Sequence, residues 1–124
     1  MDLVVGAESG VEALVAEGDL AHQLGSGDVP VLGTPRVLAL MEAACVGVTA
    51  GRLPPGSTSV GVRVELSHVA AVGVGAHVTA TARLEGVEGR RLRFSVRVSD
   101  GVSLLAEGVV ERVVVDRERF VAGL

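Results

Sequence analysis

The sequence predicts an α+β domain in which a curved antiparallel β-sheet wraps round one long central helix. Two observations predict this class. From Ser57 onward, apolar and polar residues alternate with the period of two that is typical of half-buried strands. Ahead of this region, Val37 to Val48 is apolar on almost every side, as in a helix that is buried on most of its surface. A chain of 124 residues has the size of one domain, so residues 1–124 are expected to form a single unit.

The expected helix has recognisable start and stop signals. Thr34 is a suitable N-cap, and Pro35 fits the first helical position. Gly51, followed by Pro54-Pro55-Gly56, ends the helix. Upstream, residues 10–18 are predicted as a strand, and residues 19–31 as an irregular connection.

Four strands are expected after the helix, joined by short hairpins. Turns are predicted at residues 87–90 and at Asp100-Gly101, and the last strand, at about residues 102–115, is long enough to hold a bulge near Gly108. The side chains expected to face inward are, strand by strand, Val60, Val62, Val64, Leu66 and His68, then Val78, Ala80, Ala82 and Leu84, then Leu92, Phe94, Val96 and Val98.

One strand, one long helix and four antiparallel strands, in this order, is the arrangement of the hotdog fold. A ferredoxin-like fold would need a second amphipathic helix in mid-chain. Small β-barrels do not usually place an apolar helix of about four turns after the first strand. Both alternatives therefore fit less well.

Composition excludes several classes of function. Aromatic residues make up 2% of the chain, so modules that stack nucleic-acid bases on aromatic rings have no material here. The net charge of −4 also disfavours a nucleic-acid partner. No apolar run is long enough for a membrane span, the N-terminus lacks the regions of a signal peptide, and the one cysteine cannot form an intramolecular disulfide, so a cytoplasmic protein is expected.

Three residues are candidates for chemistry. Glu42 is the one carboxylate on the apolar helix, where burial is costly unless the group has a partner. His68 has the inward parity of the following strand, so the two side chains could meet as an acid and imidazole pair. Thr34 adds a hydroxyl at the helix N-terminus, where free N–H groups can stabilise an oxyanion. Each residue also has a structural alternative: Glu42 could form a structural hydrogen bond, His68 could be a hydrogen-bonded core histidine, and Thr34 could only cap the helix.

The other titratable residues are interpreted as structural or exposed. Cys45 is expected to be a small core residue, and His22 and His77 are expected to face solvent. Three widely spaced histidines and one cysteine match no zinc pattern, so neither a metal nor another cofactor is expected. The cluster Arg90, Arg91 and Arg93 is either a solvated hairpin or a phosphate-binding edge.

From Thr34 to Phe120 the chain resembles the fluoroacetyl-CoA thioesterase-like branch of the hotdog superfamily. The resemblance is carried by residues 40–46 (Leu-Met-Glu-Ala-Ala-Cys-Val), by the strand from Val60-Gly61 to Ser67-His68, and by the hairpin 87–92 with Asp100-Gly101. It implies that Thr34, Glu42 and His68 form a catalytic set and that the Gly61 N–H lies near the thioester. Leu20 to Gly33 contains no aromatic residue, unlike the family, so fluoroacetyl selectivity is not expected.

The resemblance implies hydrolysis of acyl-CoA thioesters, without a metal, by a homodimer joined edge to edge, with a tetramer as an alternative. Substrate contacts are expected from Gly61, Arg90 and Arg91. The nucleophile is left open between Thr34, Glu42 and a water activated by His68. Two other functions remain: an acyl-CoA-binding protein without turnover, and a structural dimer in which Glu42 and His68 satisfy each other.

Overall fold

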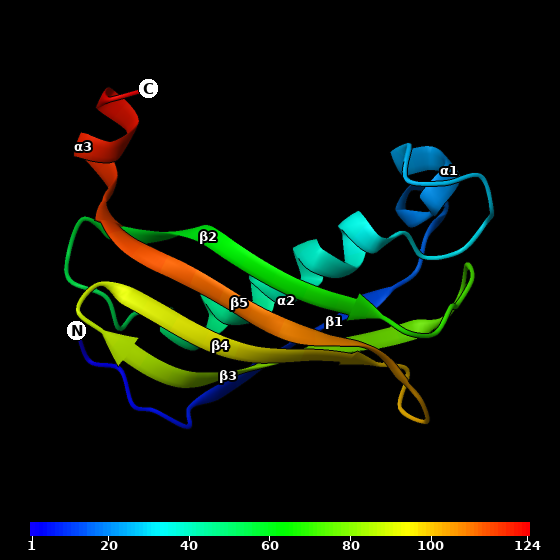
Figure 1. Cartoon of the computed structure of the whole chain (residues 1–124), viewed down its shortest axis with the longest axis horizontal. Helices are drawn as coiled ribbons and strands as arrows, with labels where there is room; N and C mark the ends of the chain where they lie inside the picture. Colours follow the sequence, from blue (N-terminus) through cyan, green and yellow to red (C-terminus); the bar gives the residue numbers. More distant parts are fainter.

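The computed structural model describes all 124 residues and contains five strands and one long helix (Figure 1). The strands are β1 (Glu8–Leu14), β2 (Ser57–His68), β3 (His77–Glu88), β4 (Arg91–Ser99) and β5 (Leu104–Asp116). The helical segments are η1 (Glu17–Asp19), α1 (Ala21–Leu24), α2 (Thr34–Thr49) and α3 (Arg117–Ala122). None of these helices is both long and apolar enough to span a lipid bilayer.

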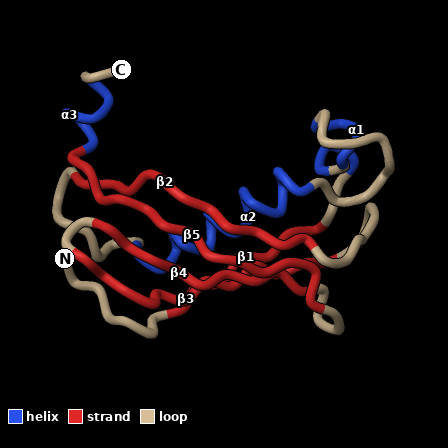
Figure 2. Tube along the Cα trace, in the orientation of Figure 1, coloured by secondary structure: helices blue, strands red, loops and turns tan.

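The strands form one antiparallel sheet in the order β1-β3-β4-β5-β2, so β1 and β2 are its edges. Helix α2 lies across one face of the sheet, and the other face carries no helix (Figure 2). The β3–β4 hairpin turns at Gly89-Arg90, where Gly89 has the positive φ of +60° that such a turn needs. The predicted α+β class and sheet-round-helix architecture are confirmed.

The core lies between α2 and the middle of the sheet. The inward residues predicted for β3 and β4 are all buried, from Val78 to Leu84 and from Leu92 to Val98. The prediction for β2 is wrong in part, because Val62 and Val64 are 48% and 37% exposed. The register shifts between Gly61 and Arg63, so Val62 has no partner on β5 and the inward parity changes there. Before the shift, Gly61 and not Val60 lies on the inward face, opposite Arg112. Val64 lies on the inward face opposite Val110, but on an edge strand, whereas α2 packs mainly on β1 and β3.

The start of α2 also differs from the prediction. Gly33 is the N-cap, and Thr34 and Pro35 are the first two residues of the helix, with no side-chain cap. The Thr34 hydroxyl contacts His68 instead. Although α2 is apolar nearly all round, it leaves a stripe of small residues exposed, formed by Ala39, Ala43, Val46 and Gly47.

Three further details correct the sequence-based picture. Strand β1 starts at Glu8 and ends at Leu14, because the chain turns into η1 where Asp19 accepts a hydrogen bond from the Ala16 N–H. The register of β5 is continuous at Gly108, and the shift against β2 lies between Gly61 and Arg63. The C-terminal helix α3 was not predicted, although Asp116 caps it by accepting from the Arg119 N–H.

Candidate active site

Thr34 and His68 meet at the end of the sheet where α2 begins and β2 ends (Figure 1). A hydrogen bond of 2.8 Å joins Thr34 Oγ1 to His68 Nδ1. The contact forms because Gly33 caps the helix in place of Thr34, which leaves the Thr34 hydroxyl free to reach across to the strand. With the hydroxyl as donor, the neutral imidazole carries its proton on Nε2. A hydroxyl bound to an imidazole is the pairing from which a serine or threonine nucleophile is activated.

The other ring nitrogen of His68 is exceptional. Nε2 is buried and has no hydrogen-bond partner. A buried polar atom without a partner costs about 1–3 kcal/mol, and such costs are found more often at functional sites than elsewhere. The imidazole is therefore held by one side chain only, that of Thr34.

A cavity of about 390 Å³ opens beside this pair. Its walls come from the connection between α1 and α2 and from the residues that follow β2. Besides Thr34 and His68, it is lined by Ala21, Ser26, Gly27, Asp28, Val29, Val31, Leu32, Gly33, Val69, Ala70 and Ala71. This position allows a substrate group to lie against the hydroxyl–imidazole pair.

Glu42 lies two turns further along α2 and forms an ion pair with Arg112 of β5. Arg112 Nη1 donates to Glu42 Oε2 at 2.8 Å. Ser59 holds the rest of the guanidinium, because Arg112 Nε donates to Ser59 Oγ and Nη2 donates to the Ser59 carbonyl, both at 2.9 Å. The Arg112 side chain is only 8% exposed, whereas that of Glu42 is 36% exposed. Arginine thus supplies a fixed, charged donor to a half-buried carboxylate.

The sequence analysis missed Arg112, although a signal for it was present. Arg112 lies on the same parity of β5 as Val110 and Val114, which are both buried. A cation on the inward face of a strand needs a buried acid, and Glu42 was the one carboxylate on the central helix.

Gly61 lies directly against the Glu42 carboxylate. A Cβ on Gly61 would lie 2.6 Å from Glu42 Oε2, closer than real Cβ contacts. Gly61 is also paired with Arg112 in the ladder between β2 and β5, next to the register shift. A side chain at this position would push the carboxylate away from Arg112.

The chain therefore holds two groups of candidate residues. Thr34 and His68 form one, and Glu42, Gly61 and Arg112 form the other. Gly61 and His68 lie opposite Arg112 and Ala106 of β5, six positions apart in the ladder, which is about 20 Å at about 3.3 Å per residue. The hypothesis that Glu42 and His68 meet is wrong for a single chain, because Glu42 binds Arg112 and His68 binds Thr34.

Arg90 and Arg91 lie at the far end of the sheet from His68 (Figure 1). Arg91 pairs in register with Val113, whereas His68 pairs with Ala106. Arg91 Nη2 donates to Glu111 Oε2 at 3.0 Å, and this bond lowers the pKa of Glu111 and raises the pKa of Arg91. Arg90, in the turn, forms no ion pair. Neither arginine can reach the Thr34–His68 pair of its own chain.

Cys45 is fully buried in the core, as expected. Burial raises the pKa of its thiol to about 12, which the nearby Arg112 charge opposes only in part. A thiol that stays protonated is a poor nucleophile. Cys45 is therefore a packing residue. The exposure of His22 and His77 also agrees with the sequence analysis.

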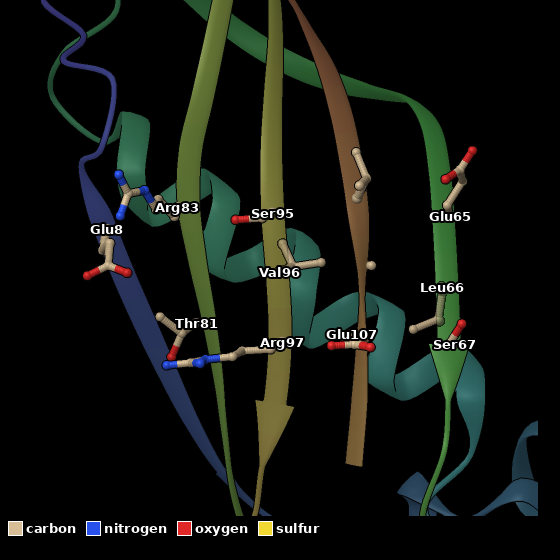
Figure 3. Close-up of a pocket in the computed structure, with 12 residues that line it drawn as sticks. Glu8, Glu65, Leu66, Ser67, Thr81, Arg83, Ser95, Val96, Arg97 and Glu107 are labelled. Atoms are coloured by element: carbon tan, nitrogen blue, oxygen red, sulfur yellow. The ribbon is translucent and has the colours of Figure 1, made fainter. Parts of the chain in front are cut away.

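A larger hollow of about 610 Å³ lies on the sheet face that α2 does not cover (Figure 3). It is lined by charged and hydroxyl side chains of all five strands, among them Glu8, Arg83, Arg97 and Glu107. None of the candidate catalytic residues lines it. The site is therefore assigned to the α2 side of the sheet.

One known protein family matches most of the chain. The profile of the FlK family, described as fluoroacetyl-CoA-specific thioesterase, matches residues 15–118. The chain belongs to this family. A fluoroacetyl-CoA thioesterase of Streptantibioticus cattleyicolor is 44% identical over 90 residues, which cover 73% of this chain and 65% of that protein. The match thus spans slightly less than two thirds of the relative.

Solved structures show the same architecture along nearly the whole chain. The fluoroacetyl-CoA-specific thioesterase FlK superposes with a TM-score of 0.91 at 35% identity, covering 98% of this chain and 94% of FlK. A Thermus thermophilus thioesterase superfamily member superposes with a TM-score of 0.89 at 27% identity, and the match covers 97% of this chain and 89% of the Thermus chain. A hot-dog-like protein of Thermanaerovibrio acidaminovorans has a TM-score of 0.88 at 29% identity, and the match covers 98% of this chain and 90% of the Thermanaerovibrio chain. The fold is the hotdog fold.

Proposed function

We propose that this protein hydrolyses acyl-CoA thioesters to a free acid and CoA. The observation that carries the proposal is the Thr34–His68 hydrogen bond at the mouth of a cavity, in a chain of this family. A thioester carbonyl is electrophilic and a thiolate leaves readily, so a modest nucleophile with an oxyanion donor is sufficient. FlK has been solved, as a variant, with fluoroacetate and CoA, which is consistent with a CoA ligand for the family fold.

In the proposed reaction, His68 handles the proton. A C–O bond forms between the carbonyl carbon and an oxygen of Thr34, Glu42 or water, and the C–S bond breaks. The proton that the imidazole takes from Thr34 or water passes to the departing CoA thiolate. If Thr34 is the nucleophile, water then cleaves the acyl-enzyme, and His68 passes the proton of this water back to the Thr34 oxygen. If Glu42 is the nucleophile, it brings no proton and CoA leaves as a thiolate; the water that cleaves the anhydride then gives one proton through His68 to that thiolate, and the carboxylate is restored. The Gly61 N–H is proposed as a donor to the carbonyl oxygen.

A second copy of the chain is part of the proposal, because one chain keeps the two groups apart. Strand β2 is a free edge of the sheet, and its exposed Val62 and Val64 would be covered by an antiparallel β2 of a partner. With a two-fold axis between Val64 and Glu65, the partner's Gly61 would lie opposite His68. The partner's Glu42 would then come close to the Thr34–His68 pair.

The same dimer would also place arginine side chains of one chain near the cavity of the other. An antiparallel β2 pair places the far end of one sheet beside the His68 end of the other. The partner's Arg90 would approach the mouth of the cavity. Because Arg91 is held by Glu111 and Arg90 is free, Arg90 is the better proposal for a contact with the phosphates of CoA. A cytoplasmic location, with the one cysteine as a free thiol, completes the proposal.

One observation favours a second function. The Arg112 ion pair satisfies Glu42 within the chain, as expected if the carboxylate only stabilises the fold. A dimer that binds acyl-CoA without cleaving it would keep the same cavity. Turnover separates the two functions.

The proposal is tested by free-thiol release from a panel of acyl-CoAs. The parent should turn over, and His68→Ala and Glu42→Gln should each lose at least about a hundredfold in kcat. His77→Ala and Glu107→Gln are the matched controls, because both side chains are exposed and lie outside the site; they should retain activity. Full activity in folded Glu42→Gln, or saturable binding without thiol release, would refute the proposed mechanism.

A further inference from the structure

The cavity beside Thr34 and His68 has the features of an acyl pocket for a group larger than two carbons. About 390 Å³ is room for a dozen water molecules, at about 30 Å³ each. A two-carbon acyl group displaces only two or three of these. A group this small would leave most of the wall without contact, and so would gain little from it.

About half of the wall is aliphatic, and the aliphatic side chains are short; the rest of the wall is glycine or polar, with Ser26, Asp28, Thr34 and His68. Val29, Val31, Leu32 and Val69 supply the larger apolar groups, and Ala21, Ala70 and Ala71 leave space between them. The chain has only two phenylalanines, and neither lines the cavity: Phe94 is buried in β4, and Phe120 lies on α3. Apart from the His68 imidazole, no ring therefore narrows the pocket or offers a stacking surface.

Charge limits which acyl groups fit. Asp28 is the one carboxylate on the wall, and no arginine lines the cavity. Arg36, in the first turn of α2, does not line the cavity and is paired with Asp19 through a 3.0 Å hydrogen bond from Nε. An acyl group that ends in a second carboxylate would therefore meet Asp28 inside the cavity, where no cation of the same chain balances the charge.

From size, apolar lining and charge together, we infer that the acyl group is neutral and aliphatic, with about four to eight carbons. The inference rests on the proposed function and narrows it to a substrate class. It separates this chain from the relatives whose names specify fluoroacetyl-CoA. Val29 and Asp28 are assigned as the residues that set acyl length and exclude acidic acyl groups.

The test is kcat/KM for acetyl-, fluoroacetyl-, butyryl-, hexanoyl-, octanoyl-, dodecanoyl- and succinyl-CoA. Each added methylene should raise kcat/KM about fourfold until the pocket is full, with the maximum between butyryl and octanoyl. Succinyl-CoA should be at least tenfold worse than butyryl-CoA, and Asp28→Asn should reduce that ratio. A maximum at acetyl- or fluoroacetyl-CoA, or a succinyl rate equal to the butyryl rate, would overturn the inference while leaving the thioesterase proposal intact.

Two valine variants locate the effect. Val29 is 51% exposed in the wall of the cavity, and Val102 is 94% exposed in the turn after β4, outside it. Val29→Phe should move the maximum toward acetyl-CoA, and Val102→Phe should not move it. If no thioester is cleaved at all, the thioesterase proposal fails, and the affinities of non-cleavable thioether analogues of the same chain lengths test the pocket. The affinities of these analogues should follow the same order of chain lengths as the expected kcat/KM values. Equal affinities for all chain lengths would overturn the inference about the acyl pocket.

Discussion

Thr34 shows how local context changes the role of one residue. A threonine before a proline is a good cap by its chemistry, yet here Gly33 takes the cap position and the hydroxyl binds His68 at 2.8 Å. The residue lies one position inside the helix, and this single step turns the side chain from the helix end toward the strand. Thr34 could be singled out as a candidate from the sequence, but its hydrogen-bond partner depends on the position of β2 relative to the start of α2.

Arg112 is expected to act by holding Glu42 in place. Arg112→Lys keeps the charge but cannot bind Glu42, Ser59 Oγ and the Ser59 carbonyl together. We expect a loss of about tenfold or more in kcat with a fold that still forms, whereas Arg112→Ala should also cost a few kcal/mol of stability. Thiol-release kinetics and urea unfolding measure the two effects separately.

The matched control is Arg63→Lys, since Arg63 is exposed and its ion pairs lie on the outer face of the sheet. It should leave kcat unchanged. If Arg112→Lys showed the parent's kcat and pH profile, Glu42 would need no positioning by the guanidinium.

The Cys45 thiol should be inert while the protein is folded. Its pKa is raised to about 12 by burial, so almost no thiolate forms at pH 8. Ellman's reagent should therefore react at pH 8 only after urea unfolding. The thiol of the unfolded chain ionises at the ordinary cysteine pKa of about 9, so the stability that this group contributes should be lost as pH rises from about 9 toward 12. Rapid labelling of the native protein would contradict this burial, and Cys45→Ala should lack that part of the alkaline loss.

At the scale of the elements, β5 lies against β2 at Gly108 with no space for a side chain. Gly108 was expected to mark a bulge, but the ladder runs through it without a register shift. The glycine instead allows β2 to lie close, because a Cβ on Gly108 would overlap the Glu65 carbonyl oxygen. A glycine in a strand is a signal both for a bulge and for a close approach, and the sequence does not distinguish them.

Gly108→Ala is accordingly expected to destabilise the fold by about 1–3 kcal/mol, because the β2 backbone must move away. Gly18→Ala is the control, since nothing lies within 4 Å of the added Cβ and its φ is not in the left-handed region. Its stability should change by less than about 0.5 kcal/mol. Equal urea midpoints for the two variants would show that the β2 backbone moves away from position 108 without a loss of stability.

Helix α2 and strand β2 share one property, which is apolar surface without a cover. Ala43 and Val46 on the helix and Val62 and Val64 on the strand are exposed. An edge strand with unprotected valines invites pairing with another strand. Both elements are explained if a second copy of the chain covers them.

For the molecule as a whole, the central feature is the separation of the two residue groups by about 20 Å along β2. In the proposed dimer each site takes Thr34 and His68 from one chain and Glu42 from its partner. A hybrid of His68→Ala and Glu42→Gln chains would then contain one complete site. Random assembly of equal amounts makes half of the dimers hybrid. Each hybrid has one complete site of its two, so the purified hybrid should show about half of the parent's activity per dimer.

The experiment is co-expression of the two variants with different tags, followed by thiol-release assays of the purified hybrid. Each variant expressed alone should stay inactive. If the hybrid were as inactive as its components, Glu42 and His68 would have to act within one chain, and the composite arrangement would be refuted.

The general form of this fold could be read from the residue pattern. Alternation in β3 and β4 placed every inward residue correctly, because both strands lie in the middle of the sheet under α2 and burial there follows parity. The apolar segment around Met41 and the turns at Gly89 and Gly101 were equally legible, since their signals are local.

The pairing of the candidate site residues could not be predicted from the sequence, because it joins positions that are far apart in the chain. Glu42 and His68 were singled out correctly as unusual positions, but their partners, Arg112 and Thr34, are 70 and 34 residues away from them. Which side chains meet depends on the strand order, on the register shift after Gly61 and on the rotation of α2 over the sheet. Local residue patterns carry none of these three quantities, since each is set by packing between distant segments.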